Sequence, residues 1–201
     1  AFLVGGGLLK SSDGGASWVE VNHGPSNITV SALAMDPAAP GTVYASVNSA
    51  SFGGYVYKIT DGGASWTLFR GDSIFEWINT PASLAFDPTA PGTVYLVKNY
   101  AIPWGMILTG PTYCDVFKST NGGASWVTLI DRISATADPY GRCTLALDPT
   151  APGTMYVAGH KSTDGGASWA AFDTRGSVLA LDPATRTLYA SGGNYSGIWK
   201  L

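Results

Sequence analysis

The sequence predicts an all-β fold built from repeated propeller blades, because two short phrases recur along its 201 residues. The first phrase, Asp-Gly-Gly-Ala-Ser-Trp or nearly so, closes segments 11–18, 59–66, 119–126 and 162–169, here called the Asp turns. The second phrase, of the form Leu-Ala-x-Asp-Pro-x-Ala-Pro-Gly-Thr, begins at Leu33, Leu84 and Leu145, and a shortened copy begins at Leu179. Repeats of roughly 40 to 60 residues are typical of propeller blades. No stretch shows a sustained helical period.

The repeat at residues 31–70 predicts four strands. An apolar run at 31–35 ends at Asp36-Pro37, where proline stops a strand and starts a turn. Residues 42–47 are rich in β-branched and aromatic side chains, and residues 55–59 alternate apolar with polar ones. The glycines of the Asp turn accept positive φ and lead into a fourth strand at 65–69. Each repeat is therefore expected to be a four-stranded antiparallel meander with strands A, B, C and D.

The repeats predict a single domain over residues 1–201, in which about five blade units are visible. The units cover about residues 1–24, 28–70, 82–130, 143–173 and 176–201. The first unit starts at strand B and the last stops inside strand C, so both are incomplete. We expect the chain to be part of a larger ring. A compact five-bladed ring, or self-association through the open blade edges, is the alternative.

Composition excludes several classes of function. Only 12% of residues are charged and the net charge is −3, so no basic surface is available for phosphates and nucleic acid is not an expected partner. No apolar run is long enough for a membrane span. His23 and His160 are isolated and the cysteines lack metal-ligand spacing, so no metal and no cofactor is predicted.

The two cysteines, Cys114 and Cys143, leave two alternatives open. One lies at the start of a predicted strand C and the other at the start of the next strand A, which places both at the same end of the blades. A disulfide between them is one hypothesis, and two unpaired, partly buried thiols are the other.

The Asp turns resemble the Asp-box, or BNR repeat, of sialidases, sortilin-type receptors, xyloglucan-degrading glycoside hydrolases and photosystem II assembly factors. The resemblance implies that each box is a folding device between strands C and D, at the opposite end of the blade from the ligand site. Its Asp accepts backbone hydrogen bonds, and its Trp packs between blades. The structural residues are expected to be Asp13, Trp18, Asp61, Trp66, Asn121, Trp126, Asp164 and Trp169.

Antiparallel alternation places the short A–B and C–D turns at one end of the blades and the B–C and D–A loops at the other. Every irregular insertion, at residues 71–82, 98–113 and 131–142, belongs to the second end, here called the insertion end. Binding residues concentrate on such loops. The candidate ligand-binding aromatics are Phe75, Trp77, Tyr100, Trp104, Tyr113 and Tyr140. Alternatively, these aromatics pin the loops onto the blades.

These observations predict an exported binding module, extracellular or periplasmic, with a glycan or a protein as ligand, and they lean against an enzyme. Aromatic faces beside charged groups suit sugar rings. The first alternative is a glycoside hydrolase, closer to xyloglucanases than to sialidases because the chain lacks a sialidase FRIP motif. Its carboxylates would come from Asp72, Glu76, Asp131 and Asp138, near Arg132 and Arg142. The second alternative is an assembly or scaffold factor.

Overall fold

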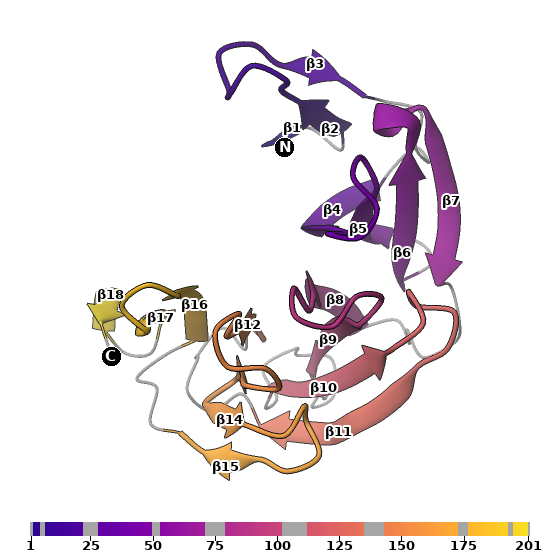
Figure 1. Ribbon diagram of the computed structural model, residues 1–201. Helices are drawn as coiled ribbons and strands as arrows, with labels where there is room; N and C mark the ends of the chain where they lie inside the picture. The colour runs from indigo at the N-terminus through magenta and orange to yellow at the C-terminus, as the bar shows by residue number, and fades with distance from the viewer. Residues whose placement is uncertain are drawn as a thin grey trace. The chain divides into compact units, whose positions relative to one another are not determined.

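The structure, a computed structural model, describes residues 2–4, 7–21, 28–49, 53–70, 79–101, 112–134, 143–172, 177–192 and 195–200. Over these residues the chain consists of β-strands, turns and a single 3-10 turn (Figure 1). Its contacts divide it into two compact units, Ala1–Pro81 and Ala82–Leu201. The single-domain assignment stays a prediction.

The first unit contains two antiparallel sheets. Strands β1 (Phe2–Val4), β2 (Gly7–Lys10) and β3 (Val19–Glu20) pair in chain order. Strands β4 (Ile28–Met35), β5 (Val43–Ser49), β6 (Gly53–Thr60) and β7 (Ser65–Arg70) form a four-stranded meander, drawn in purple in Figure 1. The 3-10 turn η1 (Asp61–Gly63) joins the last two strands.

The second unit contains three antiparallel sheets, each again a meander in chain order. The first consists of β8 (Asn79–Phe86), β9 (Val94–Ala101), β10 (Thr112–Ser119) and β11 (Val127–Ser134). The second consists of β12 (Leu145–Leu147), β13 (Met155–Val157), β14 (His160–Ser162) and β15 (Ala170–Ala171). The third consists of β16 (Ser177–Asp182), β17 (Thr187–Gly192) and β18 (Tyr195–Lys200). The predicted all-β class and its four-stranded antiparallel blades are confirmed.

Strand B is deeply buried in the sheets β4–β7, β8–β11 and β12–β15, because it has a neighbouring strand on each side and packed side chains on both faces. In β9, Val94, Tyr95, Leu96 and Val97 are each at most 1% exposed. Strands buried on both faces have continuous apolar sequences, which explains why apolar residues follow Pro-Gly-Thr in each full copy of the second phrase. The core of the first unit gathers around Leu8, Val30, Ala45, Val47 and Ile59. A corresponding core in the second unit gathers around Val97, Cys114, Val116, Ile133, Cys143, Val157 and Ala158.

The Asp turns are closed by hydrogen bonds between their own side chains and backbone. In the fourth turn, the Ser162 hydroxyl donates to Asp164 Oδ1 at 2.8 Å and accepts from the Gly166 N–H at 2.9 Å. Asp164 Oδ1 also accepts the Ser168 N–H at 2.9 Å, and Trp169 Nε1 donates to the Gly166 carbonyl at 3.0 Å. The first turn repeats this pattern around Asp13. The turn is therefore satisfied internally, as a folding device requires.

Asn121 replaces the aspartate in the third turn without loss of the network. Its Oδ1 accepts from the Ser119 hydroxyl at 2.8 Å and from the Ser125 N–H at 2.9 Å. Its amide Nδ2 donates to the Ser125 hydroxyl at 2.8 Å. The turn needs an acceptor oxygen at this position and does not need a negative charge.

The second Asp turn has a different backbone because Ile59 occupies the position of the serine hydroxyl. Ile59 is 1% exposed and packs in the core of the first unit. Without that hydroxyl, the chain forms the 3-10 turn at Asp61–Gly63, and Asp61 takes a φ of 55°. Apolar burial at Ile59 replaces the hydrogen bonds that the serine makes elsewhere.

The two kinds of short turn meet at the same end of each blade, as the sequence predicts. The Gly165 N–H of the fourth Asp turn donates to the carbonyl of Gly153, in the A–B turn of the same blade, at 2.9 Å. The Gly122 N–H of the third turn donates to the Gly92 carbonyl at 2.7 Å. We call this end of the blades the Asp-turn end.

The fourth Asp turn also packs against the preceding blade. Lys118 of β10 donates from Nζ to the Gly165 carbonyl at 3.3 Å. Gly166 has a φ of 93°, and a Cβ atom at this position would lie 2.3 Å from Leu129 Cδ1 of β11. Glycine is required here both for the backbone angle and for the close approach.

A comparison of two glycines tests this packing. We expect Gly166→Ala to lower the free energy of unfolding by about 3 kcal/mol, because it adds a steric overlap to the strain of a positive φ. Gly122 has a φ of 65° but no neighbouring atom within 4 Å of the added Cβ, so Gly122→Ala should cost only about 1 kcal/mol. Urea unfolding of both variants measures the difference. Equal losses would show that Leu129 does not restrict Gly166.

The charge of Asp164 should make the fourth turn sensitive to pH. Hydrogen bonds from the hydroxyl and backbone N–H of Ser168 lower the pKa of Asp164 to about 2. Because the folded-state pKa lies below that of the unfolded chain, this stabilisation is complete above the unfolded pKa and is lost as the pH falls towards 2. In Asp164→Asn, which copies Asn121, the loss of stability between pH 5 and pH 2 should be smaller than in the wild type. Unfolding midpoints at the two pH values test this, and parallel losses would contradict it.

Candidate functional site at the insertion end

Several of the residues predicted for the ligand site lie outside the described residues. These are Asp72, Phe75, Glu76, Trp77, Trp104, Asp138, Tyr140 and Arg142. The structure does describe Tyr113, Asp131 and Arg132, together with the backbone of Tyr100. They belong to β9, β10 and β11, the three strands that lead into and out of the insertions.

The strands of this blade are longer than predicted, which corrects the boundaries of two insertions. The first was expected to begin at Lys98, but β9 continues to Ala101 and β10 resumes at Thr112. Tyr100 and Tyr113 are consequently cross-strand neighbours in the ladder. The other was expected to begin at Asp131, but β11 continues to Ser134. The ladder extends because charged side chains within it find partners.

Cys114 and Cys143 form a disulfide. Cys114 lies in β10, and Cys143 precedes β12 of the next sheet. Both are fully buried. Cys143 Sγ also lies 3.7 Å from the carbonyl of Tyr113. The disulfide links two neighbouring blades of the second unit at the insertion end, so it limits their separation where the loops emerge.

A buried ion pair lies next to the disulfide. Lys98 Nζ of β9 lies 3.3 Å from Asp115 Oδ2 of β10, and the two side chains are only 8% and 10% exposed. The residues are opposite each other in the ladder. The ammonium also lies 5.8 Å from the ring centroid of Phe117. A buried charge is costly unless it is paired, so each of these two residues depends on the other.

The sheet β4–β7 has an apolar pair where this blade has two charges. In both sheets a tyrosine of strand B faces a lysine of strand C, as Tyr44 faces Lys58 and Tyr95 faces Lys118. Counted from these pairs, Val47 and Tyr55 take the positions of Lys98 and Asp115. The blade architecture therefore does not require an ion pair, since the sheet β4–β7 forms without one at this position.

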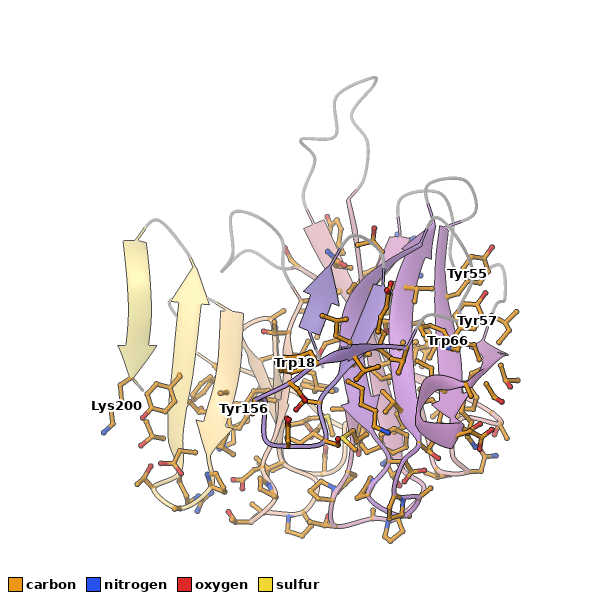
Figure 2. All side chains as sticks on the ribbon, turned by 90° about the horizontal axis from the view of Figure 1, so that it is seen from above. Trp18, Tyr55, Tyr57, Trp66, Tyr156 and Lys200 are labelled. Carbon is orange, nitrogen blue, oxygen red and sulfur yellow. A yellow bond between two sulfur atoms is a disulfide. The ribbon has the colours of Figure 1, made fainter. Side chains whose placement is uncertain are left out.

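Tyr55 of that apolar pair belongs to a row of aromatic side chains on the sheet. Tyr55, Tyr57 and Trp66 lie along β6 and β7 in Figure 2, with ring centroids 6.5 Å and 6.0 Å apart. All three are half-buried and pack against the core of the first unit. Their role is therefore packing within the blade.

Asp115 also holds a bulge in the neighbouring strand. Cys114 pairs with Ile133 and Val116 pairs with Ile130, so both Asp131 and Arg132 lie opposite Asp115. The Arg132 N–H donates to Asp115 Oδ1 at 3.0 Å. Arg132 has a φ of 67°, in the left-handed region. Bulges re-aim side chains and are frequent beside functional sites.

The bulge exposes two opposite charges at the start of the last insertion. The side chains of Arg132 and Asp131 are 66% and 75% exposed, and Arg132 Nε lies 3.8 Å from Asp131 Oδ1. A guanidinium donates hydrogen bonds and a carboxylate accepts them, so the pair can bind a ligand that does both. Asp115, by contrast, is committed to Lys98 and to the Arg132 backbone.

A cavity of about 190 Å³ lies at the Asp-turn end of the first unit. It lies between the sheets β1–β3 and β4–β7, and its walls include Leu8, Val21, Val43 and Ile59, with Lys10 as the charged group. Its location differs from that of the predicted site.

Over the part of the chain that the structure describes, no group of three or more His, Cys, Asp or Glu residues could hold a metal ion. Within those same residues, no helix has the length and hydropathy needed to cross a bilayer.

Solved structures that are similar to this chain include the following three. A GH74 enzyme of Niastella koreensis has a TM-score of 0.61 and 24% identity, over 86% of this chain and 28% of that enzyme. A chain of a nidogen–laminin complex has a TM-score of 0.58 and 11% identity, over 89% of this chain and 61% of that chain. A GH74 xyloglucanase of Xanthomonas campestris has a TM-score of 0.47 and 20% identity, over 76% of this chain and 22% of that enzyme.

The first two of these similarities establish the fold. The chain has the blades of a β-propeller. It spans less than two thirds of either of these two proteins. No protein-family model and no curated protein matches the sequence.

Two sets of residues in this structure were missed by sequence reasoning. One is the pair Lys98 and Asp115, which resemble ordinary surface charges in the sequence. The other is the repeated lysine before each Asp turn. Lys118 Nζ lies 5.4 Å from the ring centroid of Tyr95, and Lys161 Nζ lies 5.5 Å from that of Tyr156. A lysine at a constant distance before every Asp turn was the available signal.

The role of the buried ion pair can be tested by exchanging it for the apolar pair of the sister sheet, β4–β7. Asp115→Ala should lower the free energy of unfolding by about 3 kcal/mol or more, because Lys98 stays buried without its carboxylate. The double variant Lys98→Val/Asp115→Tyr, which copies Val47 and Tyr55, should lose much less. Chemical unfolding compares the two. A double variant as unstable as Asp115→Ala would show that the pair is needed for folding itself.

Proposed function

We propose that this chain is an exported β-propeller module that binds a glycan at the insertion end of its blades. The observation that carries the proposal is the contrast between the two ends. At the Asp-turn end, the polar groups of the short turns bond to one another. At the insertion end, the described residues include a disulfide, a buried ion pair and an extended ladder, and the sequence continues from these strands into long, aromatic-rich segments. Rigid scaffolds that carry variable loops are typical of binding sites.

The sequence of the insertions favours a sugar ligand. Residues 71–82 and 98–113 contain Trp77 and Trp104, together with further aromatics and carboxylates. Aromatic faces stack on the apolar faces of sugar rings, and the charged groups bind the hydroxyls. Export is supported by the disulfide, because disulfides persist in oxidising compartments. The resemblance of the Asp turns to Asp-boxes agrees with such a module.

Two observations favour alternatives to simple glycan binding. Similarity to a GH74 enzyme favours a glycoside hydrolase, with carboxylates from Asp72, Glu76, Asp131 and Asp138. Similarity to a chain of a nidogen–laminin complex favours a protein ligand at the same end of the blades. A hydrolase requires two carboxylates on either side of one glycosidic bond. Of the four candidate carboxylates, the structure describes Asp131.

A glycan array, run beside a hydrolysis assay on the same oligosaccharides, tests the proposal. We expect the wild type to bind without turnover, and the double variant Trp77→Ala/Trp104→Ala to lose binding. Val127→Ala is the matched control, because Val127 is 60% exposed and follows the third Asp turn. Turnover would identify a hydrolase. Absence of both binding and turnover would reject the glycan and leave the protein ligand.

A further inference from the structure

Strands β10 and β11 pair with two register shifts, and one of them has an equivalent between β6 and β7 of the sister sheet β4–β7. In the sister sheet the register shifts between Val56 and Tyr57, and the equivalent shift in β10 lies between Val116 and Phe117. The additional shift lies between Cys114 and Val116, opposite Asp131 and Arg132. The second bulge lies near the end of β11, where the chain leads into the last insertion.

The second bulge contains a residue in an unfavourable conformation. Arg132 has a φ of 67°, where the Cβ of an L-residue meets the backbone and glycine is favoured. Such residues persist when the surroundings hold them, and they gather at ligand sites. Glycine would relieve the strain but would remove the side chain. The arginine side chain is therefore the group that the strained position presents.

The surroundings that hold Arg132 are charged and buried. Asp115 Oδ1 accepts the Arg132 N–H at 3.0 Å, and Asp115 Oδ2 lies 3.3 Å from Lys98 Nζ. A tyrosine and a valine serve at these two positions in the sister sheet. Replacing such an apolar pair by two buried charges seldom improves stability. Asp115 instead provides a fixed acceptor for the Arg132 N–H in the bulge.

The side chains of Asp131 and Arg132 face solvent next to each other. Arg132 and Asp131 are both largely exposed, with Nε 3.8 Å from Oδ1, and β11 ends two residues later at the last insertion. Two neighbouring hydroxyls of a sugar can donate one hydrogen bond to the carboxylate and accept one from the guanidinium. A carboxylate-bearing ligand would be attracted by Arg132 but repelled by Asp131.

We infer that Asp131 and Arg132 form a ligand-contacting pair for adjacent hydroxyls of a neutral sugar, and that Lys98 and Asp115 are its positioning residues. The inference rests on the proposed function and adds to it the chemical class of the ligand and the residues that contact it.

The chain provides a matched control in Arg186. It is also a non-glycine residue at positive φ, at 55°, and its side chain is 65% exposed. Its guanidinium lies 3.5 Å from a carboxylate oxygen, that of Asp148. It lies in an A–B turn, at the end of the blades opposite the insertions. Arg132→Gly and Arg186→Gly thus make the same change at the two ends.

The experiment measures melting temperature and affinity for Arg132→Gly, Arg186→Gly and Asp131→Asn. The probes are the neutral oligosaccharide that binds most strongly on the array and, as an acidic comparison, polygalacturonate. Arg132→Gly should lose about 10- to 100-fold in affinity for the neutral probe, the range expected for charged hydrogen bonds, at an equal or higher melting temperature. Arg186→Gly should keep wild-type affinity. Asp131→Asn should weaken neutral binding.

The outcomes separate this inference from the proposed function. If the wild type binds the neutral probe and Arg132→Gly binds it equally well, the contact pair is wrong while the glycan-binding function stands. If Asp131→Asn tightens binding and polygalacturonate is the better ligand, the neutral-sugar class is wrong. If the wild type binds neither probe, both fail. For the positioning role, Lys98→Val/Asp115→Tyr should lose affinity at a retained melting temperature, and unchanged affinity would overturn that role.

Discussion

The contact between the Asp turn and the A–B turn of the same blade supports most of the described structure. One hydrogen bond, from Gly165 N–H to the Gly153 carbonyl, joins the turn between strands C and D to the turn between strands A and B. The next glycine, Gly166, allows Leu129 of the preceding blade to approach. A single glycine pair thus determines both the closure of one blade and its spacing from its neighbour. The turn accordingly has glycine in every copy. Its aspartate is replaceable, because Asn121 Oδ1 accepts the same backbone hydrogen bond in the third turn.

This constraint separates the two ends of a blade by chemistry. The Asp-turn end uses its hydroxyls, carboxylates and N–H groups in internal hydrogen bonds, so few of them are available to a ligand. In the sheets β4–β7, β8–β11 and β12–β15, strand B is buried on both faces, so it offers little surface to a ligand. Variation is therefore concentrated at the insertion end. In the sheet β8–β11 it includes a disulfide, a strained bulge and two buried charges, and an apolar pair takes the place of those charges in the sister sheet β4–β7.

The hydrogen bonds that close each Asp turn are local, within about four residues, so a turn at each of these positions could be predicted from the sequence. The candidate site could be predicted only in outline. The insertions, the cysteine pair and the exposed Asp131 were identified, since loop length and residue type are visible along the chain. The ion pair was not, because Lys98 and Asp115 are 8% and 10% exposed only through a ladder that joins distant segments.

By itself, the sequence determined the all-β class, the four-stranded repeat and the end at which each turn lies. These follow from local turn chemistry and from the alternation of strand direction, which need no knowledge of distant contacts. Tertiary structure alone decided that Cys114 and Cys143 form a disulfide and that Ile59 is buried in the core. It also decided that Asp115 accepts a hydrogen bond from Arg132, which lies at positive φ. The reason is that pairing between strands sets which side chains lose water, and burial determines whether a charge, a thiol or a strained residue is stable.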